Sequence, residues 1–456
     1  MFEAPDAVLA GRGVCFDPIG GMQTHTSELT RMLARRGVRQ TVLTTRPPGA
    51  PSFEGLGSSE VRRHGLPVPW ARQGWCVSAG PQALRLARRA DLVHAHLGED
   101  IAVLPMALAA ARAGAIPLVV TIHTSVRHTY LAVGLRGHVL KLLGTAAEAA
   151  VVPHATAVIA LTARLAERLT DVEPERLHVV PSGVVPAGCA SAGDDPLPDV
   201  PHPRVLFVGR LHRRKGVLTL IRAAAQMRTS GAQIVVVGDG PEREAAMAAA
   251  RRLGLAERVH FTGFRPHREI PAILGHTDVF AMPSVYEELG SVLLEAMQAG
   301  LPIVASRTGG IPEAVGPAAE LVAPGDAGAL AAQLDRLLTD EDAAARLSRL
   351  ARARALRYDW RRLADEVLSI YDTVCGRSDG ADGQAGARRS VRARGRAGAP
   401  PGSARGEELA LVADPSSASS GPRRRSSADP RSTAASSSPQ AKGIERVGRG
   451  SLAPSE

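Results

Sequence analysis

The stretch VFAMPSVYEELGSVLLEAMQA, residues Val279–Ala299, contains an apolar run, a loop and an apolar amphipathic segment in immediate succession. Val279–Met282 predicts a buried strand, and Ser291–Ala299 predicts a helix that begins after the loop Pro283–Gly290. A strand followed closely by a helix is the repeating unit of an α/β fold with a parallel sheet. The unpaired N–H groups of the helix would then open at the carboxyl edge of the sheet, where such folds hold anions and sugars.

Glu295 stands in the middle of this helix. The helical period places Ser291, Glu295 and Gln298 on one polar stripe. The residues expected to pack inward are Val292, Leu293, Ala296 and Met297. The stripe could simply face solvent. However, Glu287 precedes Glu295 in the adjoining loop, and two carboxylates at a sheet edge can accept hydrogen bonds from neighbouring sugar hydroxyls.

The same strand and helix pattern recurs in two series along the chain. The first has strands at Gln40–Thr44, Leu92–His96 and Leu118–His123 and a helix at Thr24–Arg36; the second has strands at Arg204–Val208, Gln233–Val237, Val259–Thr262, Val279–Met282 and Ile303–Ala305 and helices at Val217–Met227, Glu242–Leu253, Ser291–Ala299 and Ala327–Leu338. We therefore predict an α/β protein of two Rossmann-like domains that face each other across a cleft.

The predicted boundaries follow the composition. An N-terminal domain covers residues 1–185, a linker rich in Pro and Gly covers 186–203, and a C-terminal Rossmann-like domain covers 204–357. A helix over 358–375 and a tail over 376–456 complete the chain. The first domain should start with a strand, for which only Ala7–Ala10 is apolar enough, so this strand is either degenerate or the start is displaced.

Composition excludes several function classes. Ile101–Ile122 is interrupted by Arg112, Gly114 and Pro117, so it cannot cross a membrane. No secretory signal precedes the first domain, which indicates a cytoplasmic protein. The four cysteines have no CxxC or CxxH spacing, which argues against a zinc site and against a disulfide framework. We expect no metal site and no cofactor.

Much of the formal net charge of +10 lies in the tail, where 14 Lys and Arg face 8 Asp and Glu. Because the tail is rich in Ser, Gly, Pro and Arg and poor in aliphatic residues, we predict that it is disordered. Its arginine runs could touch an anionic surface or simply be solvated. The body shows no basic stripe, and aromatic residues make up only 3% of the chain, so no nucleic-acid partner is expected.

A cationic turn follows the first strand of the second series, in VGRLHRRKG at Val208–Gly216. Arg210 and Lys215 flank a turn into a helix, an arrangement that suits a diphosphate. Lysine is rare in this chain, which makes Lys215 notable, whereas Arg213 and Arg214 could be a solvated basic turn. GDGP at Gly238–Pro241 forms another glycine-rich turn, a weak signal by itself.

These motifs, taken in order, resemble the retaining glycosyltransferases of family 4, which have the GT-B fold. The resemblance covers roughly residues 14–375. It rests on GGMQTH, TIHTS, GRLHRRKG, GDGP, FTGF, PSVYEELGSVLLEAM and ASRTGGIPE, which begin at Gly20, Thr121, Gly209, Gly238, Phe261, Pro283 and Ala305. It implies that Tyr358–Thr373 forms a crossover helix that packs back on the N-terminal domain.

The resemblance assigns roles to individual residues. Catalysis would involve Glu287, His123, Arg210 and Lys215; the donor would be bound by Gly20, Gly21, Arg210, Lys215, Gly290 and Glu295; the acceptor would be bound by His25, His123 and Arg127. Glu295 would hold the ribose and Glu287 the transferred sugar. From the residues alone, His123 could instead cap a core strand, and Arg127 could be surface decoration. VVPSGVV at Val179–Val185 departs from the Pro-Asn-Gly-Val-Asp that is frequent in the family.

The partners implied are a nucleoside-diphosphate sugar, with UDP the leading choice, and a small acceptor. FDPIGGMQTH and EELGSVLLEAM are most similar to 2-deoxystreptamine glycosyltransferases, with D-inositol-3-phosphate glycosyltransferases a neighbouring possibility. Two alternatives remain open. One is a membrane-surface enzyme that uses a lipid-linked acceptor, for which Leu131–Leu143 is the candidate amphipathic segment; the other is a catalytically silent binding protein of the same fold. The oligomeric state is not indicated.

Overall fold

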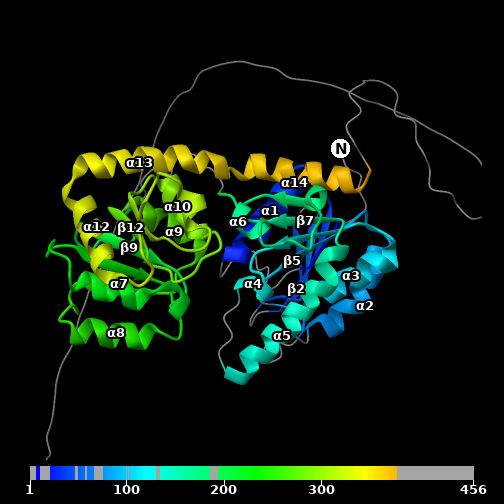
Figure 1. The fold of residues 1–456 in the computed structure, drawn as a ribbon, viewed down its shortest axis with the longest axis horizontal. Coiled ribbons are helices and arrows are strands. Elements are labelled where there is room, and N and C mark those ends of the chain that lie inside the picture. The colour runs from blue at the N-terminus through cyan, green and yellow to red at the C-terminus, as the bar shows by residue number, and fades with distance from the viewer. Residues whose placement is uncertain are drawn as a thin grey trace, which may run out of the picture. The chain divides into compact units, whose positions relative to one another are not determined.

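The computed structural model describes residues 7–10, 21–46, 50–56, 59–65, 75–98, 100, 102–129, 134–184 and 194–376 (Figure 1). Within these residues the chain builds two sheets, each covered by helices. Gly20, part of the linker at 186–203 and nearly all of the 376–456 tail lie outside the described residues. None of the described helices combines the length and the hydropathy that crossing a membrane requires.

The first sheet has the strand order β3-β4-β2-β1-β5-β6-β7-β8. Its strands are β1 Ala7–Ala10, β2 Gln40–Thr45, β3 Phe53–Leu56, β4 Ser59–His64, β5 Val93–Leu97, β6 Leu118–Ile122, β7 Ala157–Ala160 and β8 Leu177–Val179. All pairs are parallel except β3 with β4. Ala7–Ala10 does form the first strand and pairs with both β2 and β5. The sequence did not reveal β3, β4, β7 or β8, because they are short or alternate polar with apolar residues.

Helices on this sheet are α1 Gly21–Arg35, α2 Trp75–Ala87, α3 Val103–Gly114, α4 Val126–Thr129, α5 Gly134–Val151 and α6 Ala163–Ala166, with the 3-10 turns η2 Val152–His154 and η3 Pro174–Arg176. The strands β5 and β6 are buried along their whole length. Burial on both faces is the environment that favours continuous Val, Ile and Leu runs in parallel strands. Helix α1 begins three residues earlier than the sequence predicts.

The second sheet has the order β11-β10-β9-β12-β13-β14. Its strands are β9 Arg204–Val208, β10 Gln233–Val237, β11 Val259–Gly263, β12 Val279–Met282, β13 Ile303–Ser306 and β14 Glu320–Val322; its helices are α7 Val217–Ala224, α8 Arg243–Arg252, α9 Ile270–Gly275, α10 Ser291–Ala299, α11 Ile311–Val315, α12 Ala327–Thr339 and α13 Glu341–Ala355, with the 3-10 turns η4 Arg213–Lys215, η5 His267–Glu269 and η6 Leu356–Tyr358. The predicted strands and helices of this series are found, within a few residues at their ends.

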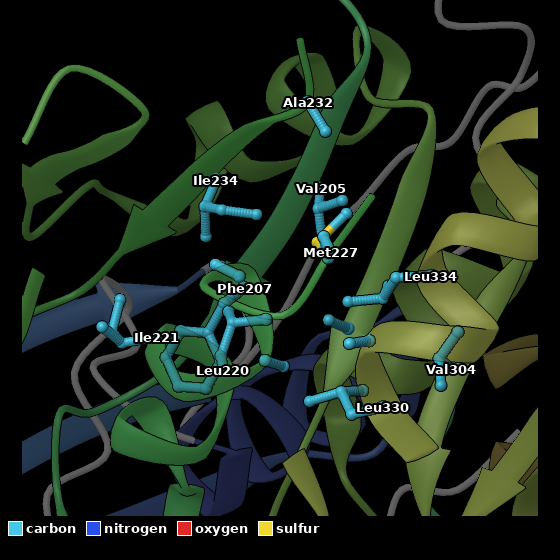
Figure 2. Packing of buried hydrophobic residues seen from close by; sticks show 14 of the residues in the cluster. Val205, Phe207, Leu220, Ile221, Met227, Ala232, Ile234, Val304, Leu330 and Leu334 are labelled. Atoms are coloured by element: carbon cyan, nitrogen blue, oxygen red, sulfur yellow. The ribbon is translucent and has the colours of Figure 1, made fainter. Parts of the chain in front are cut away.

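The core of the second sheet lies between its strands and the helices α7, α8, α12 and α13. Figure 2 shows Val205 and Phe207 of β9 and Ile234 of β10 among the side chains of this core. Leu220 and Ile221 of α7 and Leu330 and Leu334 of α12 complete it. This packing fixes the sheet from which the loops bearing the candidate site emerge.

Helix α14, Trp360–Val374, ends the described chain and packs on the first sheet. Trp360 and Leu363 share a buried cluster with Leu29 and Leu33 of α1. The Arg36 Nε donates to Asp365 at 2.5 Å. The helix therefore follows the second series in sequence but contributes its apolar face to the core of the first.

Candidate functional site

The loop between β12 and α10 carries the carboxylate Glu287, and α10 itself carries Glu295. Gly290 ends the loop with φ of +79°, a left-handed conformation that glycine adopts without steric cost. Along α10 the buried side chains are Leu293, Leu294, Ala296 and Met297. This confirms the predicted inward face, to which Leu294 must be added, while Val292 is only half-buried. Glu295 is also half-buried, so the polar stripe is not fully exposed to solvent.

Lys215 forms an ion pair with Glu287 across 72 residues of sequence. The turn η4 docks on the β12 to α10 loop, where the Val285 N–H donates to the Arg214 carbonyl at 2.8 Å. Gly216 is left-handed at φ +71°, and a Cβ there would lie 2.0 Å from the Pro283 carbonyl oxygen. The close approach that brings Lys215 to Glu287 thus requires glycine at this position.

The glycine pair Gly309-Gly310 packs against the backbone of Glu287. The Gly310 N–H donates to the Glu287 carbonyl at 3.0 Å. A Cβ at Gly309 would lie 1.8 Å from that carbonyl oxygen, and one at Gly310 would lie 1.9 Å from the Glu288 carbonyl oxygen. The TGG motif after β13 is therefore a backbone support for the carboxylate-bearing loop.

His267, in η5, pairs with Glu295 at 3.0 Å between Nε2 and Oε1. The hydrogen bond to Glu295 raises the pKa of His267 above its ordinary value, against the lowering effect of burial. No feature of the sequence indicated this partner, because it reaches Glu295 from the loop after β11.

The His267 to Glu295 pair predicts a pH-dependent contribution to stability. Because the folded-state pKa of His267 is raised, its contribution is complete below pH of about 6.5 and is lost as pH rises through the folded-state pKa. We expect wild-type protein to exceed His267→Gln in melting temperature most clearly at pH 5.5 to 6 (about one unit below the ordinary histidine pKa). The gap should narrow toward pH 8.5, which is about two units above that pKa. A gap that is constant with pH would contradict the ion pair.

Three histidines form a buried group in the first sheet, hereafter the histidine cluster: His25 of α1, His96 of β5 and His123, which follows β6. His96 Nδ1 and His123 Nε2 are 3.1 Å apart. The ring centroids of His25 and His123 are 4.5 Å apart. Desolvation lowers the pKa of all three imidazoles, so the cluster is uncharged near neutral pH.

His94, also on β5, lies next to the cluster and is fixed on both sides. Its Nδ1 is 2.6 Å from the Tyr371 hydroxyl of α14, and its Nε2 is 2.7 Å from the Thr121 hydroxyl. The predicted acceptor residues His25 and His123 are thus together, in surroundings that hold their rings in place.

The first residues of α1 and α10 approach each other. A Cβ on Gly21 would lie 2.9 Å from Ser291 Oγ. The N-termini of the two helices, one from each series, therefore lie close together. The absence of a side chain at the predicted donor-binding residue Gly21 permits this approach. Unpaired backbone N–H groups at such ends favour an anion.

The remaining predicted residues are Arg210 and Arg127. Arg210 is exposed in the turn after β9. Arg127 donates to Asp171 at 3.0 Å, and its own backbone N–H and that of Val126 are bound by the buried carboxylate of Glu148. Burial raises the pKa of Glu148. No local pattern indicated Glu148, because its role depends on the contact between α4 and α5.

Glu288 was also missed, although it follows Glu287 directly. It is buried, and accepts hydrogen bonds at 2.7 Å from the hydroxyls of Thr162 and Tyr286. Burial and the bond to Glu288 raise the pKa of Tyr286 to about 12. Glu313 similarly accepts from the Ala163 N–H at 2.8 Å. These carboxylates join the two series, a role that only the tertiary structure assigns.

Comparison with known families identifies the class of protein. Residues 19–187 match the family model described as Glycosyltransferase Family 4, and residues 195–354 match the model described as Glycosyl transferases group 1. The chain belongs to this family: it is a glycosyltransferase, an enzyme that transfers a sugar from a nucleotide sugar to an acceptor.

Several named relatives are similar to this chain over most of its length. A 2-deoxystreptamine glucosyltransferase of Streptomyces kanamyceticus is 34% identical over 393 residues, which cover 78% of this chain and all of the relative. A 2-deoxystreptamine N-acetyl-D-glucosaminyltransferase of Streptomyces fradiae is 33% identical, covering 72% of this chain and 84% of the relative. A D-inositol 3-phosphate glycosyltransferase of Salinispora tropica is 33% identical, covering 77% and 80%.

Solved structures show the same architecture. A sucrose-phosphate synthase from Thermosynechococcus elongatus superposes with a TM-score of 0.65 at 24% identity, over 82% of this chain and all of that one. The HepE protein of Anabaena, solved in complex with UDP-glucose, superposes with a TM-score of 0.64 at 21% identity, over 80% of this chain and 99% of that one. The predicted GT-B fold is therefore confirmed.

Proposed function

We propose that this enzyme transfers a hexose or N-acetylhexosamine from a UDP-sugar to a small cyclitol, with retention at the anomeric carbon and without a metal cofactor. The relatives that act on 2-deoxystreptamine support the acceptor class. The observation that carries the donor side is the pairing of Lys215 with Glu287 beside the N-terminus of α10.

On this proposal Lys215 binds the donor diphosphate, and the N-terminus of α10 faces the negative charge of the same diphosphate. As the bond from the anomeric carbon to the phosphate oxygen breaks, negative charge grows on the leaving diphosphate, and these groups stabilise it. Arg210, exposed in the neighbouring turn, would close on the diphosphate when the donor binds. Glu287, released from Lys215, accepts hydrogen bonds from the transferred sugar.

The acceptor hydroxyl attacks the anomeric carbon from the face that the diphosphate leaves. Its proton passes to the departing phosphate oxygen, so that no enzyme carboxylate forms a covalent intermediate. His123 and His25 would contact the reacting sugar and the acceptor. Because both imidazoles are held uncharged, they can donate or accept a hydrogen bond without placing a cation beside the oxocarbenium-like centre.

The state of Arg127 favours an acceptor without a phosphate group. Its guanidinium is engaged by Asp171 and its segment is held by Glu148. Arg127 is the arginine among the predicted acceptor residues, so an acceptor phosphate bound there would have to displace Asp171. An aminocyclitol makes no such demand and is therefore placed ahead of an inositol phosphate.

A lipid-linked acceptor is the second candidate, because α5 presents apolar side chains to solvent. Leu135 is 83% exposed and Leu142 is 71% exposed, next to Lys141 and Leu143. An amphipathic helix with such a face can lie in a membrane interface. Co-sedimentation with anionic vesicles, lost on Leu135→Ser together with Leu142→Ser, would favour this candidate over a soluble cyclitol.

The donor proposal is tested by a thermal-shift panel of UDP, GDP, ADP and their glucose and N-acetylglucosamine conjugates. A ligand that binds only the folded state stabilises it by about 2.7 kcal/mol at 100 times its Kd, so a UDP-selective rise in Tm is expected. Glu295→Ala should abolish most of that rise, because the ribose hydroxyls lose their acceptor. Gln298→Ala, one turn further along the same half-buried stripe, should retain it. A wild-type protein that no nucleotide stabilises would favour the silent binding protein instead.

A further inference from the structure

The histidine cluster contains buried nitrogen atoms that no protein group satisfies. His25 is 4% exposed and His96 is 0% exposed. Within the described part of the chain, His25 Nδ1 and His96 Nε2 are buried and have no hydrogen-bond partner. A buried imidazole nitrogen without a partner costs free energy, and it needs a bound water or ion to recover it.

The three rings have the spacing of a metal-binding site. Each offers one nitrogen, and these nitrogens all lie within 4.8 Å of one another. His96 Nδ1 already pairs with His123 Nε2 at 3.1 Å, whereas its unpartnered nitrogen is Nε2, so an ion takes one of these two His96 nitrogens. Nitrogens bound at about 2.0 to 2.1 Å in a tetrahedral zinc site are about 3.3 Å apart. Ring rotations that shorten separations of at most 4.8 Å to about 3.3 Å would bring all three onto one ion.

The chemistry of the ligands is that of a borderline transition metal. Neutral imidazole suits Zn²⁺, Ni²⁺ and Cu²⁺ and is a poor ligand for Mg²⁺ or Ca²⁺. Burial lowers the pKa of all three imidazoles, so no proton must leave before they bind. Rigid elements hold two of the rings: His25 packs against Trp360 at 4.9 Å and His96 against His94 at 4.3 Å between centroids.

We propose that His25, His96 and His123 bind one divalent transition-metal ion, with Zn²⁺ preferred, and that this ion inhibits the enzyme. Three histidines leave the fourth tetrahedral position open. Since the ligands carry no charge, an anion or hydroxide would fill that position. The inhibitory part rests on the proposed function, because the ion occupies the nitrogen of His123 that would otherwise contact the sugar.

The site is tested by calorimetric titration of the untagged, EDTA-treated full-length chain with ZnCl₂ in the absence of nucleotide. We expect about one zinc per chain, as three ligands on one ion require. His96→Gln and His25→Gln should each weaken binding at least tenfold, whereas His178→Gln on β8 should bind like wild type. Absence of saturable zinc binding, or binding that neither cluster variant weakens, would overturn the proposal.

A cluster variant could lose zinc binding because it misfolds. Cobalt substitution avoids this ambiguity, because the Co²⁺ spectrum reports the ligand geometry in the wild-type chain. An intense visible absorption typical of tetrahedral Co²⁺, removed by EDTA, is expected; a weak octahedral spectrum would overturn the site. Zinc should also lower sugar transfer, and EDTA should restore it. Zinc that binds without inhibiting would overturn the inhibitory role and leave the site standing. Because the titration uses no nucleotide, its result is independent of the donor panel.

Discussion

Replacing Lys215 with alanine is expected to lower kcat about 100-fold, which corresponds to about 2.7 kcal/mol of transition-state stabilisation. Lys215 is half-buried, pairs with Glu287 and lies where the leaving diphosphate is proposed to gain charge. Its loss should affect turnover more than donor affinity, since the charge that it stabilises is greatest in the transition state. Steady-state kinetics with the donor found in the thermal-shift panel measures the effect.

Arg213→Ala is the matched control. Arg213 belongs to the same η4 turn and carries the same charge, but it is exposed. It should leave kcat within about twofold of wild type if local position, not net charge, decides the effect. Glu287→Gln is then made in the wild-type protein and in Lys215→Ala. This double-mutant cycle separates a direct effect of Lys215 on the diphosphate from an effect that Lys215 exerts through Glu287. Lys215→Ala that costs nothing further when Glu287 is already glutamine would assign the lysine a positioning role only.

Replacing Gly309 with alanine is expected to destabilise the protein by about 2 to 4 kcal/mol and to impair donor binding. Gly309 has φ of +57°, and an added Cβ would lie 1.8 Å from the Glu287 carbonyl oxygen. The loop must move to relieve this overlap, which also disturbs the bond from the Gly310 N–H to Glu287. Chemical denaturation and UDP titration measure the two effects.

Gly325→Ala is the control that separates the free-energy cost of a left-handed backbone from the cost of steric overlap by the added Cβ. Gly325 has φ of +83°, but a Cβ there has no atom within 4 Å. Its substitution should cost about 1 kcal/mol, the penalty of a left-handed residue alone, and should leave nucleotide binding unchanged. Equal costs at Gly309 and Gly325 would show that the Glu287 loop yields easily and would contradict its role as a rigid support.

In the second series the sequence predicted the strands β9 to β13 and the helices α7, α8, α10 and α12, but not β14, α9, α11 or α13. The first series was predicted only in part. In the second, runs such as Gln233–Val237 are β-branched from Ile234 onward, a composition that burial on both faces of a parallel sheet favours. In the first, β4 alternates polar with apolar residues and β8 has only three residues, so neither produces a clear signal. Local pattern identifies a strand only where burial acts on both faces.

The candidate site also has features that the sequence predicted and features that only the structure revealed. The sequence alone determined that Glu295 lies on the polar face of a helix that follows a strand, because helical period and the preceding strand fix both facts. That this face is half-buried was decided by the structure. The sequence also located Lys215, Glu287 and His123 as polar residues that follow strands. His25 was indicated only by the family resemblance, and His96 was not predicted.

Only the tertiary structure decided which of these residues are partners. The pairs Lys215 with Glu287 and His267 with Glu295, and the meeting of His25, His96 and His123, join loops, helices and strands that are far apart in the sequence. Such partnerships depend on strand order and on the glycines that permit close backbone approach. Neither is encoded within one helical turn or one strand, and so no local pattern could specify them.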